Sequence, residues 1–428
     1  MAEDKIAELE RKLLEAKNHA MEERRQREEA EQQTRCTTLV EYIQYCHDLL
    51  FTRFAVETNK SLTSKGSVTN PQNKLCPTHL VPWVDFLDQQ KTTFGILHST
   101  FPAQIEAFES RNLLLGLGER ISKKKIANEK DLEYFHHIGI EYPVKSIVER
   151  LAAEDAVRDA FSIGNGIVFE THLSALRDVN EEVVDRHAAQ LPPVTPGQPR
   201  PHPNADLDLN TLRPDQICVY KEDGNPGRRI LAYVIEYKAP HKLTLPHLRL
   251  GLRQMDIYRE VINRPTKPTA ADSEALFRYY ADWLVAAVVT QTFHYMIQGG
   301  LEYGFMTTGE AIVFLKIDWA DPTTIYYHLA EPKEEVLAHG DNRYYCTAVS
   351  QILAFSLIAL GSPGQQRSHG QKERAAAEKR LRRWTVDYKI ILQSTKADGQ
   401  MVPPSTIGYV PITYKEVDRS PRVVRVIK

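Results

Sequence analysis

Cysteine is scarce in this sequence of 428 residues, which holds five, and no two of them have the C-x-x-C spacing of a zinc or redox site. Neither a zinc-binding module nor a disulfide framework is therefore expected. The N-terminal stretch MAEDKIAELERK is highly charged and lacks the apolar segment of a secretory signal peptide. We expect an intracellular protein, cytoplasmic or nuclear or both, with reduced thiols at Cys36, Cys46, Cys76, Cys218 and Cys346.

Long apolar runs and a strong net charge are also absent. The longest apolar stretches, such as residues 283–289 and 352–360, are too short to span a bilayer, so we expect no membrane partner. The formal net charge is −2 at pH 7. A protein with so little net charge exerts no global attraction on nucleic acid, so any contact with DNA or RNA must come from local basic patches.

Several catalytic signatures are missing as well. No G-x-x-x-x-G-K-[ST] phosphate loop is present, and Gly299-Gly300 follows a predicted helix instead of opening one. The 15 histidines include no H-E-x-x-H, and the kinase set of a glycine-rich loop with H-R-D and D-F-G does not occur. These absences argue against a P-loop NTPase, a zinc protease and a protein kinase.

What the sequence does contain is a predicted hairpin that gathers two carboxylates and a lysine. Residues 216–220 alternate around apolar side chains, residues 230–235 are a run of β-formers, and the intervening EDGNPG is dense in turn-forming residues. Pairing of the two strands brings Asp215 and Glu236 towards the same edge of a sheet. Because successive side chains on a strand alternate faces, Lys238 points the same way as Glu236.

These three residue types suit metal-dependent cleavage of a phosphodiester. Asp215 and Glu236 offer hard oxygen ligands for Mg²⁺ or Mn²⁺, and Mg²⁺ in particular keeps several waters and binds substrate phosphate. Such a metal lowers the pKa of a bound water and offsets the charge that builds on the phosphate. Lys238 beside it would orient the attacking water or stabilise the added negative charge. An ordinary surface hairpin with salt bridges is the alternative interpretation.

The pattern P-D, about twenty residues, then E-x-K resembles the PD-(D/E)XK nuclease superfamily. The resemblance implies a glutamine on the helix after E-x-K, for which Gln254-x-x-x-Tyr258 and Gln291-x-x-x-Tyr295 are the candidates. Gln254 lies at the commoner distance from the E-x-K motif, whereas the helix of Gln291 leads directly into the next pair of strands. We favour Gln291 for that reason and leave Gln254 as the alternative.

The same resemblance implies a glutamate that helps to hold the metal, on the helix before the hairpin. Glu149, Glu154 and Glu170 are candidates, and we name Glu149 first because it lies beside the apolar stripe of a helix expected over residues 142–161. Positive side chains around the core motif are plausible phosphate contacts, which would position a nucleic acid without reading its sequence. These are Arg213, His241, Lys242, Arg249 and Arg253.

Residues 3–35 form helix-favouring, highly charged sequence without glycine or proline, and predict a coiled coil. Its apolar residues recur at alternating spacings of three and four, at Ile6, Leu9, Leu13, Ala16 and Ala20. One interpretation is self-association into a homo-oligomer through this seam. The other is a solvated helix laid against its own domain, because fewer than four clean heptads are present.

The remaining elements predict an α/β (α+β) protein whose order of helices and strands is that of a restriction-endonuclease-like core. Helices are expected at about 246–263 and 274–298, and strands at 303–306 and 311–317. Further helices are expected around 348–360 and 372–383. We divide the chain into a coiled coil (1–35), a helical region (36–135), a PD-(D/E)XK nuclease-like domain (136–330) and a helical and irregular extension (331–428).

Three stretches resemble the Spok spore-killer family of ascomycete meiotic drivers: RPD…IEYKAPHKL, LVAAVVTQTFHYMIQGGLEYGFMTTGEAIVFLKI and RRWTVDYKIIL. In that family a nuclease-like domain is implicated in killing and a C-terminal kinase-like domain in resistance. The resemblance implies that this chain is a toxin portion, with DNA as the favoured substrate and sequence-independent binding. No kinase motif occurs before Lys428, so we do not expect self-resistance of it. The alternative is an inactive nuclease-fold scaffold that binds nucleic acid or a partner and oligomerises through its coiled coil.

Overall fold

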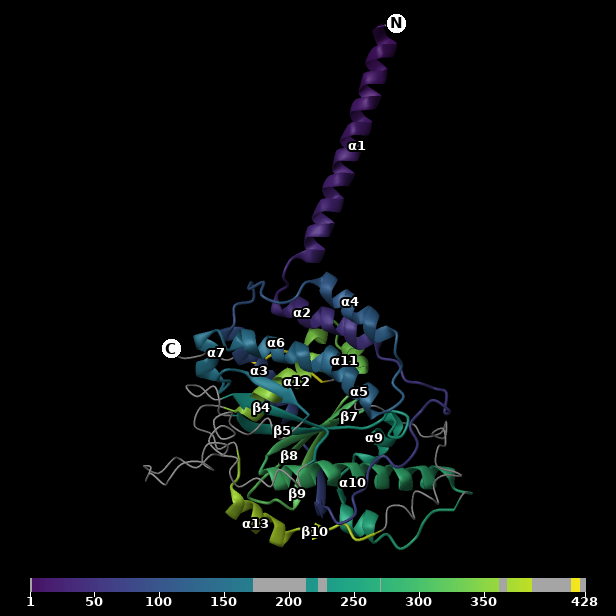
Figure 1. Ribbon diagram of the computed structural model, residues 1–428, viewed down its shortest axis with the longest axis vertical. Coiled ribbons are helices and arrows are strands. Elements are labelled where there is room, and N and C mark those ends of the chain that lie inside the picture. Colours follow the sequence, from purple (N-terminus) through teal and green to yellow (C-terminus); the bar gives the residue numbers. More distant parts are fainter. Residues whose placement is uncertain are drawn as a thin grey trace, which may run out of the picture.

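A mixed eight-stranded sheet lies at the centre of the protein, with strands in the order β3-β4-β5-β7-β8-β9-β2-β6 (Figure 1). The pairs β5–β7 and β9–β2 are parallel, and the others are antiparallel. The strands are β2 (His79–Pro82), β3 (Ile167–Glu170), β4 (Gln216–Lys221), β5 (Arg229–Tyr237), β6 (Met255–Asp256), β7 (Tyr303–Thr307), β8 (Ile312–Ile317) and β9 (Thr324–Ala330). The structure, a computed structural model, describes residues 2–171, 213–221, 229–269, 271–361, 368–386 and 417–423.

Helices cover both faces of this sheet, which confirms the expected α/β class (Figure 1). Side chains of β5 alternate between two cores: Tyr233 packs with α3, α6 and α12 on one face, and Val234 packs with α9 and α10 on the other. The helices are α2 (Leu39–Tyr45), α3 (Phe86–Thr100), α4 (Arg111–Ser122), α5 (Glu129–His136), α6 (Tyr142–Leu151), α7 (Asp155–Ala160), α9 (Leu245–Gly251), α10 (Ser273–Gly299), α11 (Pro332–Ala338), α12 (Ala348–Leu360) and α13 (Gln371–Arg380).

The strands predicted around the hairpin, and the long helix after it, are confirmed. β4 and β5 pair antiparallel with Gln216 opposite Ile235, and β5 then pairs with β7 in parallel. α10 makes the crossover between these parallel strands, packed on β5 and β7. Asp272 caps its first turn by accepting a hydrogen bond from Ala275 N–H (3.0 Å), and Gly300 ends it in the left-handed conformation (φ 65°).

Two helices expected as continuous are broken. The predicted helix 142–161 divides into α6 and α7, because Glu154 between them is extended (φ −99°, ψ 117°). The predicted helix 246–263 keeps only α9, followed by β6 and a π-helical turn at Tyr258–Ile262. α9 ends where Gly251 meets α10: a Cβ on Gly251 would lie 2.5 Å from the Ala281 carbonyl oxygen. Helix periodicity alone does not report such a close crossing.

The regions 36–135 and 331–428 share the core of the central domain. β2, from the first of them, lies in the sheet between β9 and β6, and α12, from the second, packs under β5. Arg419 also returns to this body, where its buried guanidinium pairs with Glu335 (2.9 Å). Among the described residues no single helix is long and apolar enough to cross a membrane. The helical turn Gly340–Cys346 and α12, which meet at an angle of 54°, reach that length and composition only when taken together.

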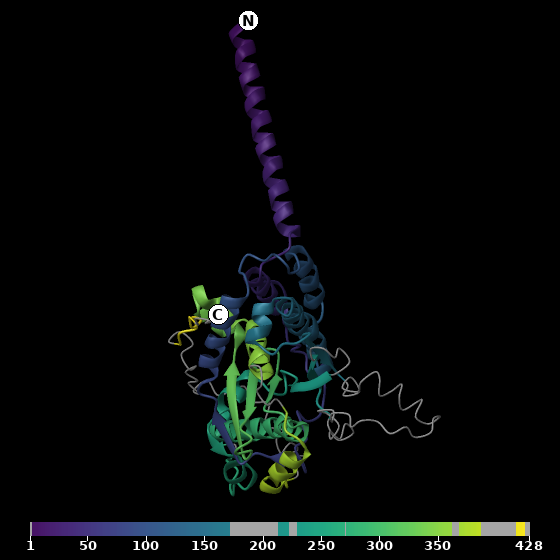
Figure 2. The same ribbon diagram turned by 90° about the vertical axis from the view of Figure 1, so that its left-hand side faces the viewer.

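The N-terminal helix α1 (Ala2–Thr34) projects away from the body of the protein in both views (Figures 1 and 2). Its seam faces solvent, with Ile6 56%, Leu9 65% and Leu13 57% exposed. Ion pairs between residues three or four apart, such as Arg24 with Glu28 (2.8 Å), line its surface. The interpretation of a helix laid against its own domain is therefore wrong for α1.

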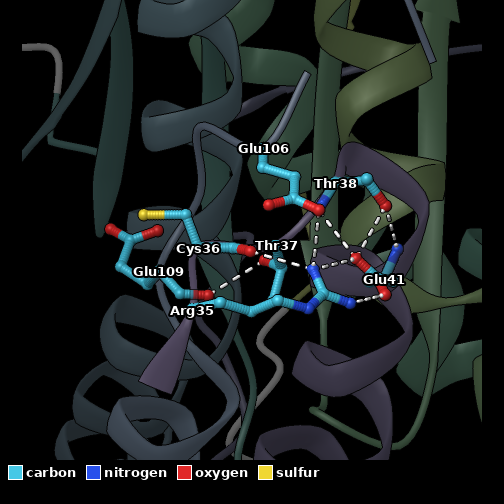
Figure 3. A network of polar contacts seen from close by, with 7 residues as sticks. All are labelled: Arg35, Cys36, Thr37, Thr38, Glu41, Glu106 and Glu109. Atoms are coloured by element: carbon cyan, nitrogen blue, oxygen red, sulfur yellow. Dashed lines mark hydrogen bonds and ion pairs between the residues drawn. The ribbon is translucent and has the colours of Figure 1, made fainter. Parts of the chain in front are cut away.

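A polar network fixes the base of α1 to the body (Figure 3). Arg35 donates to the Cys36 carbonyl (3.0 Å), to Glu41 (3.1 Å) and to Glu106 (3.3 Å). Glu41 in turn accepts from Thr38 N–H (2.9 Å), which starts α2, and the Arg35 guanidinium lowers the pKa of Glu41 to about 2. One arginine thus ties the end of α1 to α2 and to the loop that precedes α4.

Two buried histidines make the fold sensitive to acid. Leu75 N–H donates to His294 Nδ1 (3.3 Å), and Thr244 N–H donates to His247 Nδ1 (3.3 Å). Burial lowers the pKa of each imidazole from its ordinary value of 6.5 to about 4. Between these two values the unfolded chain binds more protons than the folded protein, so the free energy of unfolding falls as the pH falls.

We expect the free energy of unfolding, measured by urea titration, to fall by roughly 1 to 3 kcal/mol per histidine between pH 7 and pH 4.5. In the variant His247→Asn/His294→Asn an amide oxygen replaces each Nδ1 acceptor without titrating, so the fall should be smaller by that amount. His19→Asn, at an exposed position on α1, is the matched control and should behave like the wild type. An equally steep pH dependence in the double variant would contradict the assignment.

Candidate active site

The hairpin brings Asp215, Glu236 and Lys238 together at one end of β4 and β5. Asp215 immediately precedes β4, and its Oδ2 accepts a hydrogen bond from Tyr237 N–H (2.9 Å). Lys238 Nζ lies 2.7 Å from Glu236 Oε2 and 3.8 Å from Asp215 Oδ2. Lys238 N–H extends the pairing of β5 with β7 by donating to the Thr307 carbonyl (2.9 Å), which holds the lysine at this end of the strands.

Burial controls the charges in this group. Glu236 is fully buried and Lys238 is 2% exposed, whereas the Asp215 side chain is 37% exposed and forms the accessible side. Burial raises the pKa of Glu236 to about 8, the Asp215 charge adds to this rise, and Lys238 opposes it. Burial alone would lower the pKa of Lys238, but the charges of Glu236 and Asp215 outweigh it and raise that pKa. Lys238 therefore stays protonated at neutral pH.

The two carboxylates have the chemistry to hold a divalent cation. Glu236 Oε1 is buried and has no hydrogen-bond partner within the described part of the chain, so it is an acceptor in need of a cation or donor. In that same part of the chain, no three His, Cys, Asp or Glu side chains gather closely enough to hold a metal by themselves. Mg²⁺ is usually held by one or two carboxylates, with waters and substrate phosphates completing its shell. Asp215 and Glu236 fit that role.

A third carboxylate near this pair is Glu129, which opens α5. Its helix starts at Asn128, whose side chain accepts from Asp131 N–H (2.9 Å). Burial raises the pKa of Glu129, while Lys238 and a hydrogen bond from Ala239 N–H counteract the rise. Glu129 therefore lies beside the residue that follows Lys238. The sequence marks it only as the first residue after a helix cap.

Glu149, named from the sequence as the supporting carboxylate, does not reach the site. It pairs with Lys145 (3.3 Å), and its Cγ lies 3.5 Å from where a Cβ on Gly166 would be. Gly166 accepts from Lys221 N–H (3.0 Å), at the end of β4 opposite to Asp215. Six strand residues separate those ends, roughly 20 Å at about 3.3 Å per residue. The prediction failed because the helix nearest in sequence packs against the far end of the strand.

Of the two candidate glutamines, the structure places Gln291 near the carboxylates. Gln291 hydrogen-bonds Tyr295 one turn later on α10, and its Oε1 accepts from the Thr69 hydroxyl. Burial raises the pKa of Tyr295 to about 12, and the charge of Glu236 adds to the rise, so the tyrosine lies within electrostatic reach of the pair. Gln254 is exposed beside β6, at the opposite edge of the sheet.

Of the five predicted phosphate contacts, His241 donates to the Ser64 carbonyl through Nε2 (3.2 Å), and the other four divide into two groups. Arg249 donates to Glu331 (2.9 Å), and Arg253 pairs with Glu260 (2.8 Å) and Asp282 (3.1 Å). These guanidiniums neutralise carboxylates of the protein, so they hold the fold together instead of offering charge to a phosphate. Lys242 lies close enough to Glu129 to lower its pKa, and Arg213 is exposed two residues before Asp215. Both remain predicted contacts.

Lys74 is a second lysine of the site, and sequence reasoning missed it. Its Nζ lies 3.2 Å from Tyr295 Oη and 4.5 Å from the centre of that ring, although the two residues are 221 positions apart. Burial lowers the pKa of Lys74, Lys238 lowers it further, and Glu236 opposes both. No local pattern marks this lysine, because only the tertiary fold brings its loop across α10.

A buried network on the other face of the sheet supports the hairpin from behind. Glu141 accepts from Gln216 Nε2 (3.1 Å) and from the Tyr237 hydroxyl, the neighbours of Asp215 and Glu236 on their strands. His136 and His137 Nδ1 each lie 3.3 Å from the same carboxylate. Burial would raise the pKa of Glu141, but these hydrogen bonds outweigh it and lower that pKa. The network ties β4 to β5 where the site begins.

Comparisons with known proteins assign the chain to a family. The family model described as "Spore killer 2 N-terminal domain" matches residues 38–386. The chain is similar to the protein named "Meiotic driver SPOK2" of Podospora anserina, with 27% identity over 377 residues, which are 86% of this chain and 48% of that protein. It thus spans about half the length of this curated relative, and no solved structure matches it. The chain belongs to the Spok spore-killer family.

Proposed function

We propose that this chain is a metal-dependent nuclease that cleaves phosphodiester bonds, with DNA as the favoured substrate, and that it is the killing part of a toxin–antidote spore killer. The observation that carries the proposal is the group of Asp215, Glu236 and Lys238 at the end of the β4–β5 hairpin. The order of elements supports it: the β4–β5 hairpin, the helix α10 and the strands β7 and β8 follow one another as the sequence pattern implied, and β7 pairs in parallel with β5.

In this proposal Asp215 and Glu236 hold Mg²⁺ or Mn²⁺. When bound, the metal supplies an activated water and neutralises charge on the phosphate. Lys238 contributes a buried, protonated amine next to both carboxylates, placed to orient the attacking water and to stabilise the oxygen charge that develops during cleavage. Gln291 and Tyr295 form the wall contributed by α10, and Glu129 adds negative charge near Lys238 and Lys242.

The direct test is cleavage by the purified full chain. Labelled duplex DNA, single-stranded DNA and RNA of matched length are incubated with Mg²⁺ or Mn²⁺, and in parallel with EDTA. We expect cleavage of DNA that requires the metal and shows no fixed cut site. If no nucleic acid is cut with either metal while DNA is still bound, the chain is the inactive scaffold of the alternative, and the nuclease proposal fails.

Binding should be electrostatic, because the expected contacts are basic side chains on phosphates and no base-reading element was found in the sequence. We expect the affinity for a 30-base-pair duplex, measured in EDTA by fluorescence anisotropy, to fall steeply between 50 and 200 mM salt as counterions are released. Duplexes of unrelated sequence should compete equally. Tight binding to one sequence that is insensitive to salt would contradict this expectation.

A further inference from the structure

A two-stranded ribbon lies beside the candidate site. β1 (Leu75–Cys76) pairs antiparallel with β10 (Arg382–Arg383), and Trp384 N–H donates to the Lys74 carbonyl (2.9 Å) at its end. The ribbon rests on α10, where Leu75 N–H donates to His294 and Cys76 Sγ lies 3.4 Å from Thr290 Oγ1. The basic stretch at the end of α13 is thereby held against the loop that carries Lys74.

Lys74 and Arg383, at this ribbon, form no ion pair with a carboxylate among the residues that the structure describes. Arg382, which pairs with β1, stacks on the Tyr258 ring (4.1 Å to its centre). Arg383 is exposed and donates to the Asn73 carbonyl (2.8 Å), the residue before Lys74, whose own Nζ contacts the Tyr295 hydroxyl. By contrast Arg380, three residues before Arg383, pairs with Asp321 (2.8 Å). Burial lowers the pKa of His294 on α10, and Lys74 and Arg383 lower it further, so both cations lie near that residue.

The position of Lys74 and Arg383 relative to the hairpin indicates which way a bound nucleic acid would run. Lys74 contacts Tyr295, the aromatic neighbour of Gln291 one turn away on α10, and is within electrostatic reach of Glu236 and Lys238. Arg383 continues the positive charge outward from Lys74 to the surface. The contacts link Arg383 at the surface, through the Asn73 carbonyl, to Lys74 and from there to Tyr295 on α10.

We propose that the β1–β10 ribbon is the entry surface for the nucleic-acid backbone, with Arg383 and Lys74 binding successive phosphates on the way to the carboxylates. This inference rests on the proposed nuclease function and names the substrate path of that site. Exposed cations without carboxylate partners bind phosphates favourably, because each contact releases counterions from the nucleic acid. The half-buried Lys74 loses little further hydration when it contacts a phosphate, because burial has already removed part of it.

The test measures DNA binding separately from cleavage. Affinity of the full chain for the 30-base-pair duplex is measured in EDTA at several salt concentrations, for the wild type, Arg383→Gln and Lys74→Gln/Arg383→Gln. We expect the double variant to bind at least tenfold more weakly at 100 mM salt, with a log–log salt slope that is smaller by about 0.9 for each lost contact. Arg380→Gln removes the same charge from the same segment and should change neither quantity. Lys74→Arg/Arg383→Lys should restore both.

The outcomes separate the two proposals. If the Gln variants bind and cleave DNA like the wild type, the ribbon is not the entry surface, and the nuclease proposal stands. If the Gln variants bind DNA more weakly and with a smaller salt dependence, while the wild type cleaves no DNA, the ribbon inference stands and the nuclease proposal fails. Competition by polyglutamate as effective as that by DNA would assign the ribbon to an acidic protein and overturn the inference. Arg383→Gln alone, at an exposed position, guards against a folding defect.

Discussion

Replacing Lys238 by alanine is expected to slow DNA cleavage by about a thousandfold while the protein remains folded. The amine is the only cation within ion-pair distance of Asp215 and Glu236 among the described residues, so its loss removes the donor aimed at the developing charge. Removal of a single such donor typically costs a factor of about 10² to 10³. The measurement is single-turnover cleavage of labelled duplex at saturating Mg²⁺.

The fold should tolerate this change because Glu236 becomes neutral by binding a proton. Burial has already raised the pKa of Glu236, and removal of Lys238 takes away the largest influence that opposes the rise. The carboxyl group is then protonated at neutral pH and is not left as an unpaired buried charge. We therefore expect a thermal unfolding midpoint within a few degrees of the wild type.

Two further variants identify the role of each group. Glu236→Gln should abolish cleavage and weaken Mn²⁺ binding at every pH, whereas Lys238→Ala should slow cleavage about a thousandfold and keep a carboxylate that binds Mn²⁺ once it is deprotonated. Lys316→Ala is the matched control, because Lys316 lies on a neighbouring strand opposite Tyr303, at the far end of β7 from Thr307. Wild-type cleavage rates in Lys238→Ala would remove the lysine from the mechanism and leave the hairpin as an ordinary salt-bridged turn.

The parts of the site that the sequence predicted rest on local patterns in two stretches of chain, the hairpin and α10. Antiparallel pairing of β4 with β5 brings Asp215 to Glu236, and strand alternation, which depends on neighbours in sequence, sets the faces of the side chains. The predicted turn between the strands lies outside the described residues. α10 was also predicted from its own sequence, because Gly299-Gly300 closes a long helical stretch. Gln291 follows from this, since its helix makes the crossover to β7 and so crosses the sheet beside the hairpin.

The parts that were not predicted depend on contacts between distant segments. Lys74 reaches Tyr295 because its loop is held against α10 by hydrogen bonds with that helix. Glu129 enters from α5, one helix earlier than the helix that was expected to supply the carboxylate. In the sequence Arg249 and Arg253 cannot be told apart from unpaired basic residues. Only the structure shows the carboxylates that neutralise them. Charge type is visible in a sequence, whereas charge pairing is not.

The largest structural effect is expected at α1, where replacing Leu9 and Leu13 by lysine should abolish self-association. These side chains are 65% and 57% exposed, apolar surface that a second copy of the helix would bury. Burying one leucine contributes roughly 1.5 kcal/mol or more, and a pair of helices buries four, so the variant loses roughly 6 kcal/mol of association energy. That loss weakens self-association by about 10⁴-fold.

Assembly through α1 would also bring two active sites together. Arg35 and its partners Glu41 and Glu106 fix the base of α1, so paired helices impose a defined arrangement on the two bodies (Figure 3). Parallel pairing places both bodies at the same end, whereas antiparallel pairing separates them by the helix length, about 50 Å for 33 residues. Cleavage of both strands of one duplex therefore favours the parallel arrangement.

Sedimentation velocity over a range of concentrations measures the expected change. The wild type should show a mass that rises with concentration, and Leu9→Lys/Leu13→Lys should remain a monomer of 48.9 kDa. Asn18→Lys/Gln32→Lys adds the same charge on the opposite face of α1 and should associate like the wild type. The monomeric variant should still nick plasmid DNA but linearise it more slowly, because one strand is cut per encounter. The same oligomeric state for the wild type, the leucine variant and a chain that begins at residue 36 would rule out α1 as the assembly surface.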